Sequence, residues 1–127
     1  MQILIVEDGP ECAAMLELLV EECGHTVVGR ARSFVAAREL ARVLRPDLAV
    51  IDLLLDDGNT GADLAVALHK ELGIRPLFVT GLRSLLTPAA DAISAGMLFK
   101  PVSMNEMAAG LRMAALAVGG GEGNDEA

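Results

Sequence analysis

The chain has 127 residues, of which 53% are hydrophobic, 22% charged and 2% aromatic, and its net charge at pH 7 is −8. This composition predicts one globular domain with an aliphatic core, and the acidic charge argues against binding to nucleic acid or to an anionic membrane, since both attract Lys and Arg. No apolar run reaches the roughly 20 residues of a membrane span, and the acidic residues soon after the start argue against a signal peptide.

Short apolar runs alternate with amphipathic stretches along the chain. The runs are too short for buried helices and indicate strands, whereas the stretches between them have helical periodicity. In chain order the pattern predicts a strand at 3–6, a helix at 10–23, a strand at 26–29, a helix at 34–44, a strand at 48–51, a helix at 64–72, a strand at 76–80, a helix at 88–95, a strand at 97–99 and a helix at 104–118. Ser33, Thr87 and Ser103 are expected to cap the second, fourth and fifth helices, with Glu106 completing a capping box at Ser103.

A strand followed by a helix, repeated five times over residues 1–118, indicates an α/β fold. Right-handed crossovers turn this repeat into a parallel sheet with helices on both faces, a three-layer α/β/α sandwich. Residues 119–127 are rich in Gly and acidic side chains, and we expect them to form a disordered tail. Ligands of such sheets bind beyond the carboxyl ends of the strands, so those ends hold the candidate site.

Charged and hydroxyl side chains stand at four of the five strand ends. Glu7 and Asp8 follow the first strand, Asp52 follows the third, Thr80 ends the fourth and Lys100 follows the fifth. Each alone is an ordinary loop acid, strand threonine or surface cation. Their joint occurrence predicts one pocket with three carboxylates, a hydroxyl and an ammonium group.

Three carboxylates in one pocket repel one another, and a divalent cation relieves that repulsion. Mg²⁺ prefers oxygen ligands, so we expect it to bind Asp8 and Asp52 directly and Glu7 through water, with the backbone carbonyl of Leu54 as a further ligand. Asp52 is the expected nucleophile toward phosphorus and would become an aspartyl phosphate.

Two further side chains are expected to contact the phosphoryl group on Asp52. Lys100 would add a positive charge near the phosphoryl oxygens, and Thr80 would donate a hydrogen bond to one of them. Together with the acidic residues they form one phosphoacceptor site.

This array of Glu7-Asp8, Asp52, Thr80 and Lys100-Pro101 is similar to the signature of bacterial two-component receiver domains, and the resemblance covers residues 2–118. It implies a flavodoxin-like fold with strand order 2-1-3-4-5 and Mg²⁺-dependent transfer of a phosphoryl group to Asp52 from a sensor histidine kinase or a phosphotransfer protein. It also implies a single-domain response regulator rather than an enzyme. Such a protein would signal through an output protein or act as a phosphate sink.

Residues 76–82, PLFVTGL, partly resemble the PFxFATGY motif of a subgroup of single-domain receivers. Ordinary receivers carry an aromatic switch residue three positions before the Lys, where this chain has Met97. Met97 can fill space as a flexible thioether or can simply belong to the core, and we leave both interpretations open. Receivers commonly bind partners on the face of the fourth helix, fifth strand and fifth helix, where Met104 and Met113 are expected to be partly exposed and Met107 to be buried.

Several other residues receive structural interpretations. Asp56 and Asp57 are expected to be solvated loop acids. His25 and His69 lack further ligands at zinc-site spacing. Two cysteines, Cys12 and Cys23, fall on one predicted helix, so we expect free thiols and a cytoplasmic location.

Two competing functions remain open. A phosphorylation-independent interaction module is disfavoured by the complete set of site residues. A phosphohydrolase with an Asp nucleophile is disfavoured by Leu54, because such enzymes place a second Asp two residues after the first.

Overall fold

The computed structural model describes the backbone of residues 1–126 and the side chains of residues 1–119. Its elements alternate along the chain in the order β1 (Gln2–Val6), α1 (Pro10–Glu22), β2 (Thr26–Ala31), α2 (Phe34–Leu44), β3 (Leu48–Ile51), α3 (Gly61–Leu72), β4 (Arg75–Thr80), the 3₁₀ turn η1 (Arg83–Leu85), α4 (Pro88–Ala92), β5 (Met97–Phe99) and α5 (Met104–Glu126). The strands pair in parallel in the order β2-β1-β3-β4-β5, which confirms the predicted fold and strand order.

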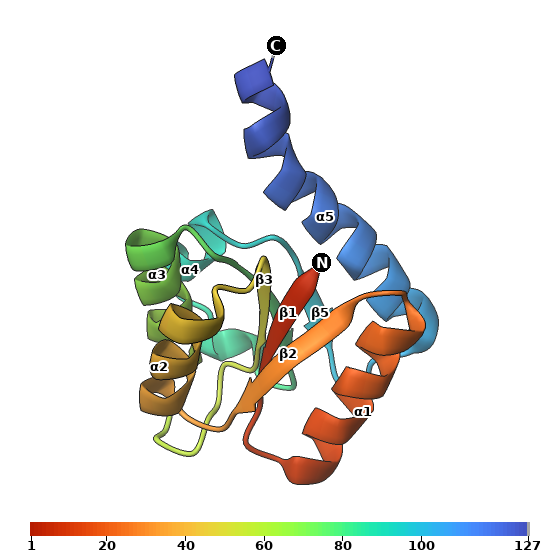
Figure 1. The fold of residues 1–127 in the computed structure, drawn as a ribbon. Helices are drawn as coiled ribbons and strands as arrows, with labels where there is room; N and C mark the ends of the chain where they lie inside the picture. The colour runs from red at the N-terminus through yellow and green to blue at the C-terminus, as the bar shows by residue number, and fades with distance from the viewer. Residues whose placement is uncertain (127) are drawn as a thin grey trace.

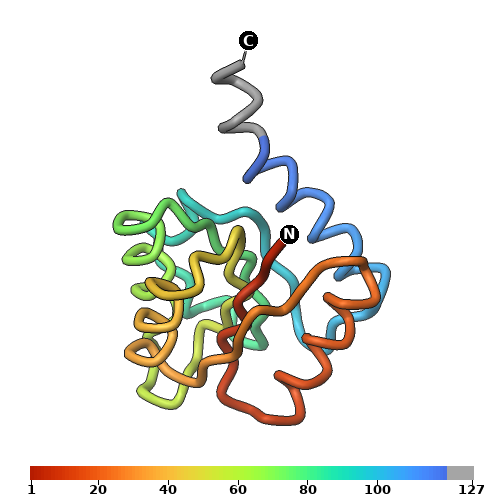
Figure 2. Tube along the Cα trace, in the orientation of Figure 1, coloured from red at the N-terminus to blue at the C-terminus, as the bar shows by residue number. Residues whose placement is uncertain are grey.

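The sheet has one apolar core on each face. Alternate residues of a strand point to opposite faces, so Leu4 and Val6 enter the core beneath α2, α3 and α4, while Ile3 and Ile5 enter the core beneath α1 and α5. Figures 1 and 2 show this arrangement, with α2 and α3 on one side of the sheet and α1 and the start of α5 on the other. Residues 3–6 of β1 and all of β3 are thereby fully buried, as their unbroken apolar sequence predicts.

The predicted caps are confirmed. Ser33 Oγ accepts from the amide of Ala36 at 3.2 Å, and Thr87 Oγ1 accepts from the amide of Ala90 at 3.2 Å. Ser103 and Glu106 bond each other's backbone amides at 3.0 and 3.1 Å, which is a complete capping box.

Several element boundaries differ from the prediction, among them the start of α3, which lies at Gly61 rather than at residue 64. Strand β2 continues to Ala31 instead of ending at Gly29, because Leu4 to Val6 of β1 pair with Gly29 to Ala31. Helix α4 ends at Ala92 rather than Ala95. The residues that follow it form a turn in which Ser94 Oγ accepts from the amide of Gly96 at 2.9 Å.

The backbone of α5 is helical to Glu126, whereas side chains from residue 120 onward and residue 127 lie outside the description. The predicted disorder of residues 119–127 falls largely on that part of the chain and stays a prediction. Among the described residues, no helix is both long and apolar enough to cross a membrane.

Candidate functional site

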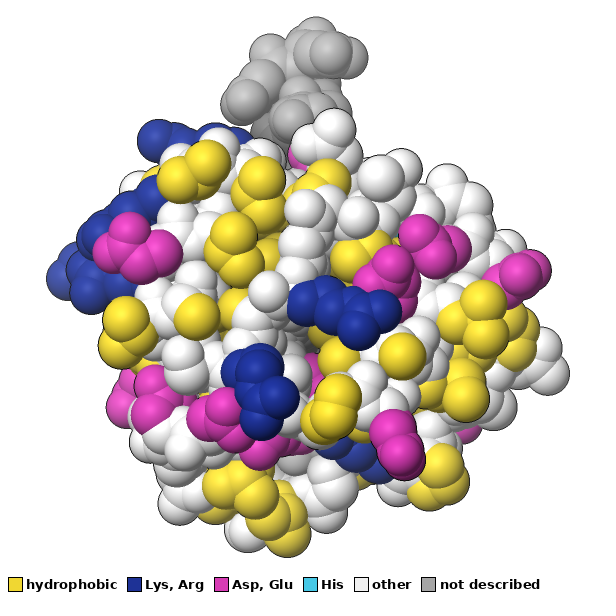
Figure 3. All heavy atoms as spheres, turned by 60° about the horizontal axis from the view of Figure 1, so that its bottom comes forward, with side chains coloured by type: hydrophobic (Ala, Val, Ile, Leu, Met, Phe, Trp, Pro, Cys, Tyr) yellow, Lys and Arg dark blue, Asp and Glu magenta, His cyan; other side chains and the backbone are white. Residues whose placement is uncertain are grey.

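The candidate site lies at the carboxyl ends of the neighbouring strands β1 and β3. Residues Ile3–Val6 of β1 and all of β3 are fully buried, and Val6 pairs with Ile51 in register. The amide of Asp52 donates to the carbonyl of Val6 at 2.9 Å. Residues that follow these strands therefore emerge side by side at the carboxyl edge of the sheet. Figure 3 turns this edge toward the viewer and shows Lys or Arg side chains beside Asp or Glu side chains near its centre.

Three carboxylates meet at this edge. One oxygen each from Glu7, Asp8 and Asp52 lies within 4.8 Å of the others. Glu7 and Asp52 are only 4% and 7% exposed, so their charges are removed from most of the water that would otherwise stabilise them. The pocket therefore concentrates negative charge in a partly dry setting.

Lys100 supplies the opposing charge. Its Nζ contacts Glu7 Oε1 at 2.5 Å and Asp52 Oδ2 at 2.6 Å, so one ammonium group bridges acids from β1 and β3. Burial by itself would lower the pKa of Lys100, but the hydrogen bonds to Asp52 and Glu7 outweigh it and raise that pKa well above its ordinary value. Lys100 is therefore cationic throughout the physiological pH range.

Glu7 is ionised less readily than a solvent-exposed glutamate. Burial raises the pKa of Glu7 above its ordinary value, although hydrogen bonds from Lys100 and from the amide of Gly9 act in the opposite direction. Proximity to Asp52 adds to the upward shift. A further positive charge in the pocket would favour the ionised form of Glu7.

Asp52 is positioned by the residues that follow it. Its Oδ1 accepts from the amide of Leu54 at 3.2 Å, while Oδ2 faces Lys100. Gly61, the first residue of α3, packs so closely behind Asp52 that a Cβ atom there would lie 2.1 Å from the carbonyl oxygen of Asp52. Only a glycine fits this contact, a role that the sequence alone did not reveal because the helix was predicted to begin at residue 64.

Thr80 lies in the same layer but is not hydrogen-bonded to the acids. It is fully buried, and its Oγ1 accepts from the amide of Leu82 at 3.1 Å. Its backbone carbonyl accepts from the amide of Lys100 at 3.1 Å, which ties the ends of β4 and β5 together. The structure thus groups Glu7, Asp8, Asp52 and Lys100 directly and connects Thr80 to them through the backbone.

Met97, at the position of the usual aromatic switch residue, is half-buried. It packs against the core beneath α2, α3 and α4, and it pairs with Phe78 of β4. Two residues later, Phe99 is 43% exposed and carries the guanidinium of Arg83 5.8 Å from its ring centre. The exposed aromatic side chain of β5 is therefore Phe99, directly before Lys100.

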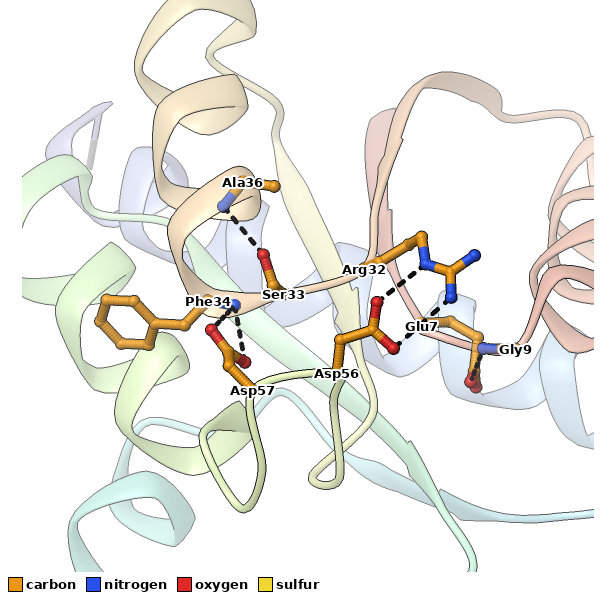
Figure 4. A network of polar contacts seen from close by, with 8 residues as sticks. All are labelled: Glu7, Gly9, Arg32, Ser33, Phe34, Ala36, Asp56 and Asp57. Atoms are coloured by element: carbon orange, nitrogen blue, oxygen red, sulfur yellow. Dashed lines mark hydrogen bonds and ion pairs between the residues drawn. The ribbon is translucent and has the colours of Figure 1, made fainter.

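An ionic network beside the site was not predicted. Asp56 and Asp57 are exposed, as expected, but each also contacts a residue that follows β2. Asp56 Oδ2 accepts from Arg32 Nε at 2.9 Å, and Asp57 accepts from the amide of Phe34 at 3.0 Å (Figure 4). Because these partners lie more than 20 positions apart, no local pattern signals them.

The remaining candidates form no second site among the described residues. His25 Nδ1 contacts the N-terminal amino group at 2.8 Å, and His69 lies in the last turn of α3. Within residues 1–119, Glu7, Asp8 and Asp52 are the group with metal-ligand geometry. Cys12 and Cys23 are free, as predicted, and both are half-buried.

Comparison with known proteins identifies the family. Residues 3–112 match the family described as response regulator receiver domain. The chain belongs to this family. Receiver domains are phosphoacceptor modules of two-component systems, which typically use Mg²⁺ at an acidic pocket, and here Glu7, Asp8 and Asp52 supply such a pocket.

Several regulators and receivers resemble this domain. The phyllosphere-induced regulator PhyR of Methylorubrum extorquens is 41% identical over 80 residues, which cover 62% of this chain and 30% of PhyR. The transcriptional regulatory protein PdtaR of Mycobacterium tuberculosis is 30% identical over 115 residues, covering 89% of this chain and 56% of PdtaR. The signal receiver domain of a modulated diguanylate cyclase from Desulfovibrio desulfuricans has a TM-score of 0.83 and 29% identity, with coverage of 92% and 94%. The chain thus matches only part of the length of PhyR and PdtaR.

The receiver's acidic pocket fits a hard cation. Carboxylate oxygens are the ligands that Mg²⁺ prefers, and three of them already lie within 4.8 Å of one another. Because one Lys faces three carboxylates, the pocket has an excess of negative charge that a bound cation would offset.

Proposed function

We propose that this receiver domain is a cytoplasmic phosphorylation switch that accepts a phosphoryl group on Asp52 from a histidine kinase or phosphotransfer protein. The observation that carries the proposal is the bridge from Lys100 to Asp52 and Glu7, at 2.6 and 2.5 Å, over a cluster of three carboxylates. Such an arrangement holds a nucleophilic carboxylate beside a fixed cation at the exposed edge of a rigid sheet.

Glu7, Asp8, Asp52 and the backbone carbonyl of Leu54 would hold Mg²⁺. When bound, the ion supplies positive charge that offsets the carboxylates and the incoming phosphoryl oxygens. The chain's own contribution is to keep these oxygens together through the pairing of β1 with β3.

The transfer itself needs one bond to form and one to break. A carboxylate oxygen of Asp52 forms a bond to phosphorus as the bond between phosphorus and the imidazole nitrogen of the donor histidine breaks, and the electron pair stays on that nitrogen. Lys100 remains protonated and pairs with a phosphoryl oxygen. The hydroxyl of Thr80 donates to another phosphoryl oxygen.

The phosphorylated domain would signal through a protein bound to the face of α4, β5 and α5, or would act as a phosphate sink. The exposed apolar side chains Phe99, Met104 and Met113 support the first route, because they are 43%, 40% and 62% exposed on β5 and α5. Met107 of the same helix is fully buried, which agrees with its predicted place in the core. Met97 is proposed to fill the space of the usual aromatic switch.

Mass spectrometry after incubation with Mg²⁺ and acetyl phosphate tests the site. We expect the protein to gain one phosphoryl group, and we expect Asp52→Asn to gain none. Asp63→Asn is the matched control, since Asp63 is an exposed aspartate in the first turn of α3 and does not belong to the carboxylate cluster. Equal labelling of Asp52→Asn and the wild-type protein would show that Asp52 is not the phosphoacceptor.

A thermal titration with Mg²⁺ separates this function from a phosphorylation-independent interaction module. The proposed switch predicts a higher melting temperature in millimolar Mg²⁺ for the wild-type protein and no such rise for Asp8→Ala. A module without a metal site predicts no rise for either protein. Steady turnover of added phosphomonoesters would instead favour the phosphohydrolase.

A further inference from the structure

Arg32 is the basic side chain that directly follows β2, and it is paired with Asp56. Arg32 Nε contacts Asp56 Oδ2 at 2.9 Å and Nη2 contacts Oδ1 at 3.5 Å, while the backbone amide of Asp56 donates to the carbonyl of Arg32 at 3.1 Å. Both side chains are exposed, Arg32 at 61% and Asp56 at 44%. An exposed pair of this kind is held only weakly, so its partners can exchange.

The same guanidinium borders the acidic pocket. Arg32 lines a cavity of about 210 Å³ together with Glu7 and Asp8. In the view of Figure 4, the side chain of Glu7 is drawn below the guanidinium of Arg32. The hydrogen bond to Asp56 raises the pKa of Arg32, and the charge of Asp8 contributes further in the same direction. The charge of Asp8 thus favours the cationic form of Arg32, while the Nε and Nη2 donors of Arg32 are directed to Asp56.

We propose that Asp56 holds Arg32 away from Asp8 and thereby keeps Asp8 available to a divalent cation. This inference rests on the proposed function, because it takes Glu7, Asp8 and Asp52 as the Mg²⁺ site. A guanidinium and a metal ion compete for the same carboxylate oxygens, and Arg pairs readily with carboxylates through two donors at once. Asp56 is therefore a positioning residue that acts on metal affinity through Arg32.

The alternative role of the pair is mechanical, as a brace between the segment after β2 and the loop that follows Asp52. Asp57 makes a second contact between the same two segments, so the two roles of Asp56 can be distinguished. Asp57 accepts from the amide of Phe34 at 3.0 and 3.2 Å and from Thr60 Oγ1 at 2.7 Å. The loop therefore stays connected to α2 when the contact between Arg32 and Asp56 is lost.

Calorimetric titration of Mg²⁺ into the metal-free full chain tests the proposal on the wild-type protein, Asp56→Ala, Arg32→Ala and the double variant. Asp56→Ala should weaken Mg²⁺ binding by about fivefold, the upper range for an exposed ion pair, because the released guanidinium turns to Asp8. Arg32→Ala should bind as tightly as wild type or more tightly. The double variant should match Arg32→Ala, since no competing cation is left.

Glu71→Ala is the matched control. Glu71 pairs with Arg42 and Arg38 at 2.9 and 2.8 Å on α2 and α3, and none of these three residues belongs to the carboxylate cluster. Its removal releases Arg38 and leaves Arg42 with the longer contact to Glu39 at 3.7 Å, and neither is placed near Asp8, so Mg²⁺ affinity should stay at the wild-type value. The loss in Asp56→Ala should also shrink as salt is raised, because the competing pair is exposed to solvent.

The possible results separate cleanly. Equal weakening in both single variants would indicate a brace and overturn the proposal, as would an unchanged affinity in Asp56→Ala. Asp56→Asn, which keeps the size of the side chain and removes its charge, should reproduce the loss and replaces Asp56→Ala if that variant fails to fold. Absence of Mg²⁺ binding in the wild-type protein overturns the metal site of the proposed function as well, and is distinguished by that first titration.

Discussion

Gly61→Ala is expected to destabilise the domain and disturb Asp52 together. The added Cβ would lie 2.1 Å from the carbonyl oxygen of Asp52 and 2.6 Å from Cα of Leu53. Even a close carbon–oxygen contact in proteins is about 3.3 Å, so the start of α3 and the end of β3 must separate by roughly 1 Å. Both atoms belong to the backbone, and no side-chain rotation can relieve the clash.

The size of the effect follows from two opposing contributions. Overpacking of a rigid site costs about 1–3 kcal/mol, and the upper part of that range fits a clash with backbone. Replacing Gly by Ala in a helix returns at most about 1 kcal/mol, and less at its first residue. We expect a net loss of about 2 kcal/mol, which lowers the melting temperature of a domain of this size by roughly 5–10 °C.

Thermal unfolding without divalent cations measures this loss, and Mg²⁺ titration of the same variant measures the disturbance of Asp52. Gly119→Ala is the control, because a Cβ at Gly119 has no heavy atom within 4 Å, and it should leave stability unchanged or slightly increased. A Gly61→Ala protein with wild-type stability and wild-type Mg²⁺ affinity would refute the reasoning.

Three further predictions concern the pocket and α5. Burial raises the pKa of Glu7, so its contribution to stability is present below its ordinary pKa of 4.5 and is lost as pH rises through the raised value. Metal-free Glu7→Gln should therefore melt above wild type at pH 8 and level with it near pH 4, and a lower melting temperature at pH 8 would contradict this. Ser103→Ala removes half of the capping box with Glu106 and should cost about 1 kcal/mol in urea unfolding. Met107→Ala should cost about 2–4 kcal/mol because Met107 is fully buried, whereas Met113→Ala, at 62% exposure, should cost less than about 0.5 kcal/mol.

The sequence was a good guide wherever the deciding interaction is local or repeats with a regular period. Unbroken apolar runs predicted the central strands, and the capping box at Ser103 spans only three residues. The carboxyl ends of parallel strands meet at one edge, so the order of the elements was enough to expect Glu7, Asp8, Asp52 and Lys100 together.

The missed features depend on contacts that only the folded chain creates. The apolar run at 26–29 predicted a strand that stops at Gly29, yet β2 continues to Ala31. A Cβ at Gly29 would lie 2.9 Å from Cδ1 of Leu44, so the glycine leaves space for that side chain of α2. The pair between Arg32 and Asp56 likewise joins two loops that lie 24 positions apart.

Thr80 offers a route from the pocket to the surface that needs no aromatic residue at position 97. Its Oγ1 accepts from the amide of Leu82, so it holds the start of the exposed segment that carries Arg83. A rotation that turned the hydroxyl toward a phosphoryl oxygen on Asp52 would break this contact. The freed segment carries Arg83, whose guanidinium lies over Phe99, so this contact between η1 and β5 would shift with it. On the proposed function, phosphorylation would therefore be read at Arg83 and Phe99 as well as at Met97.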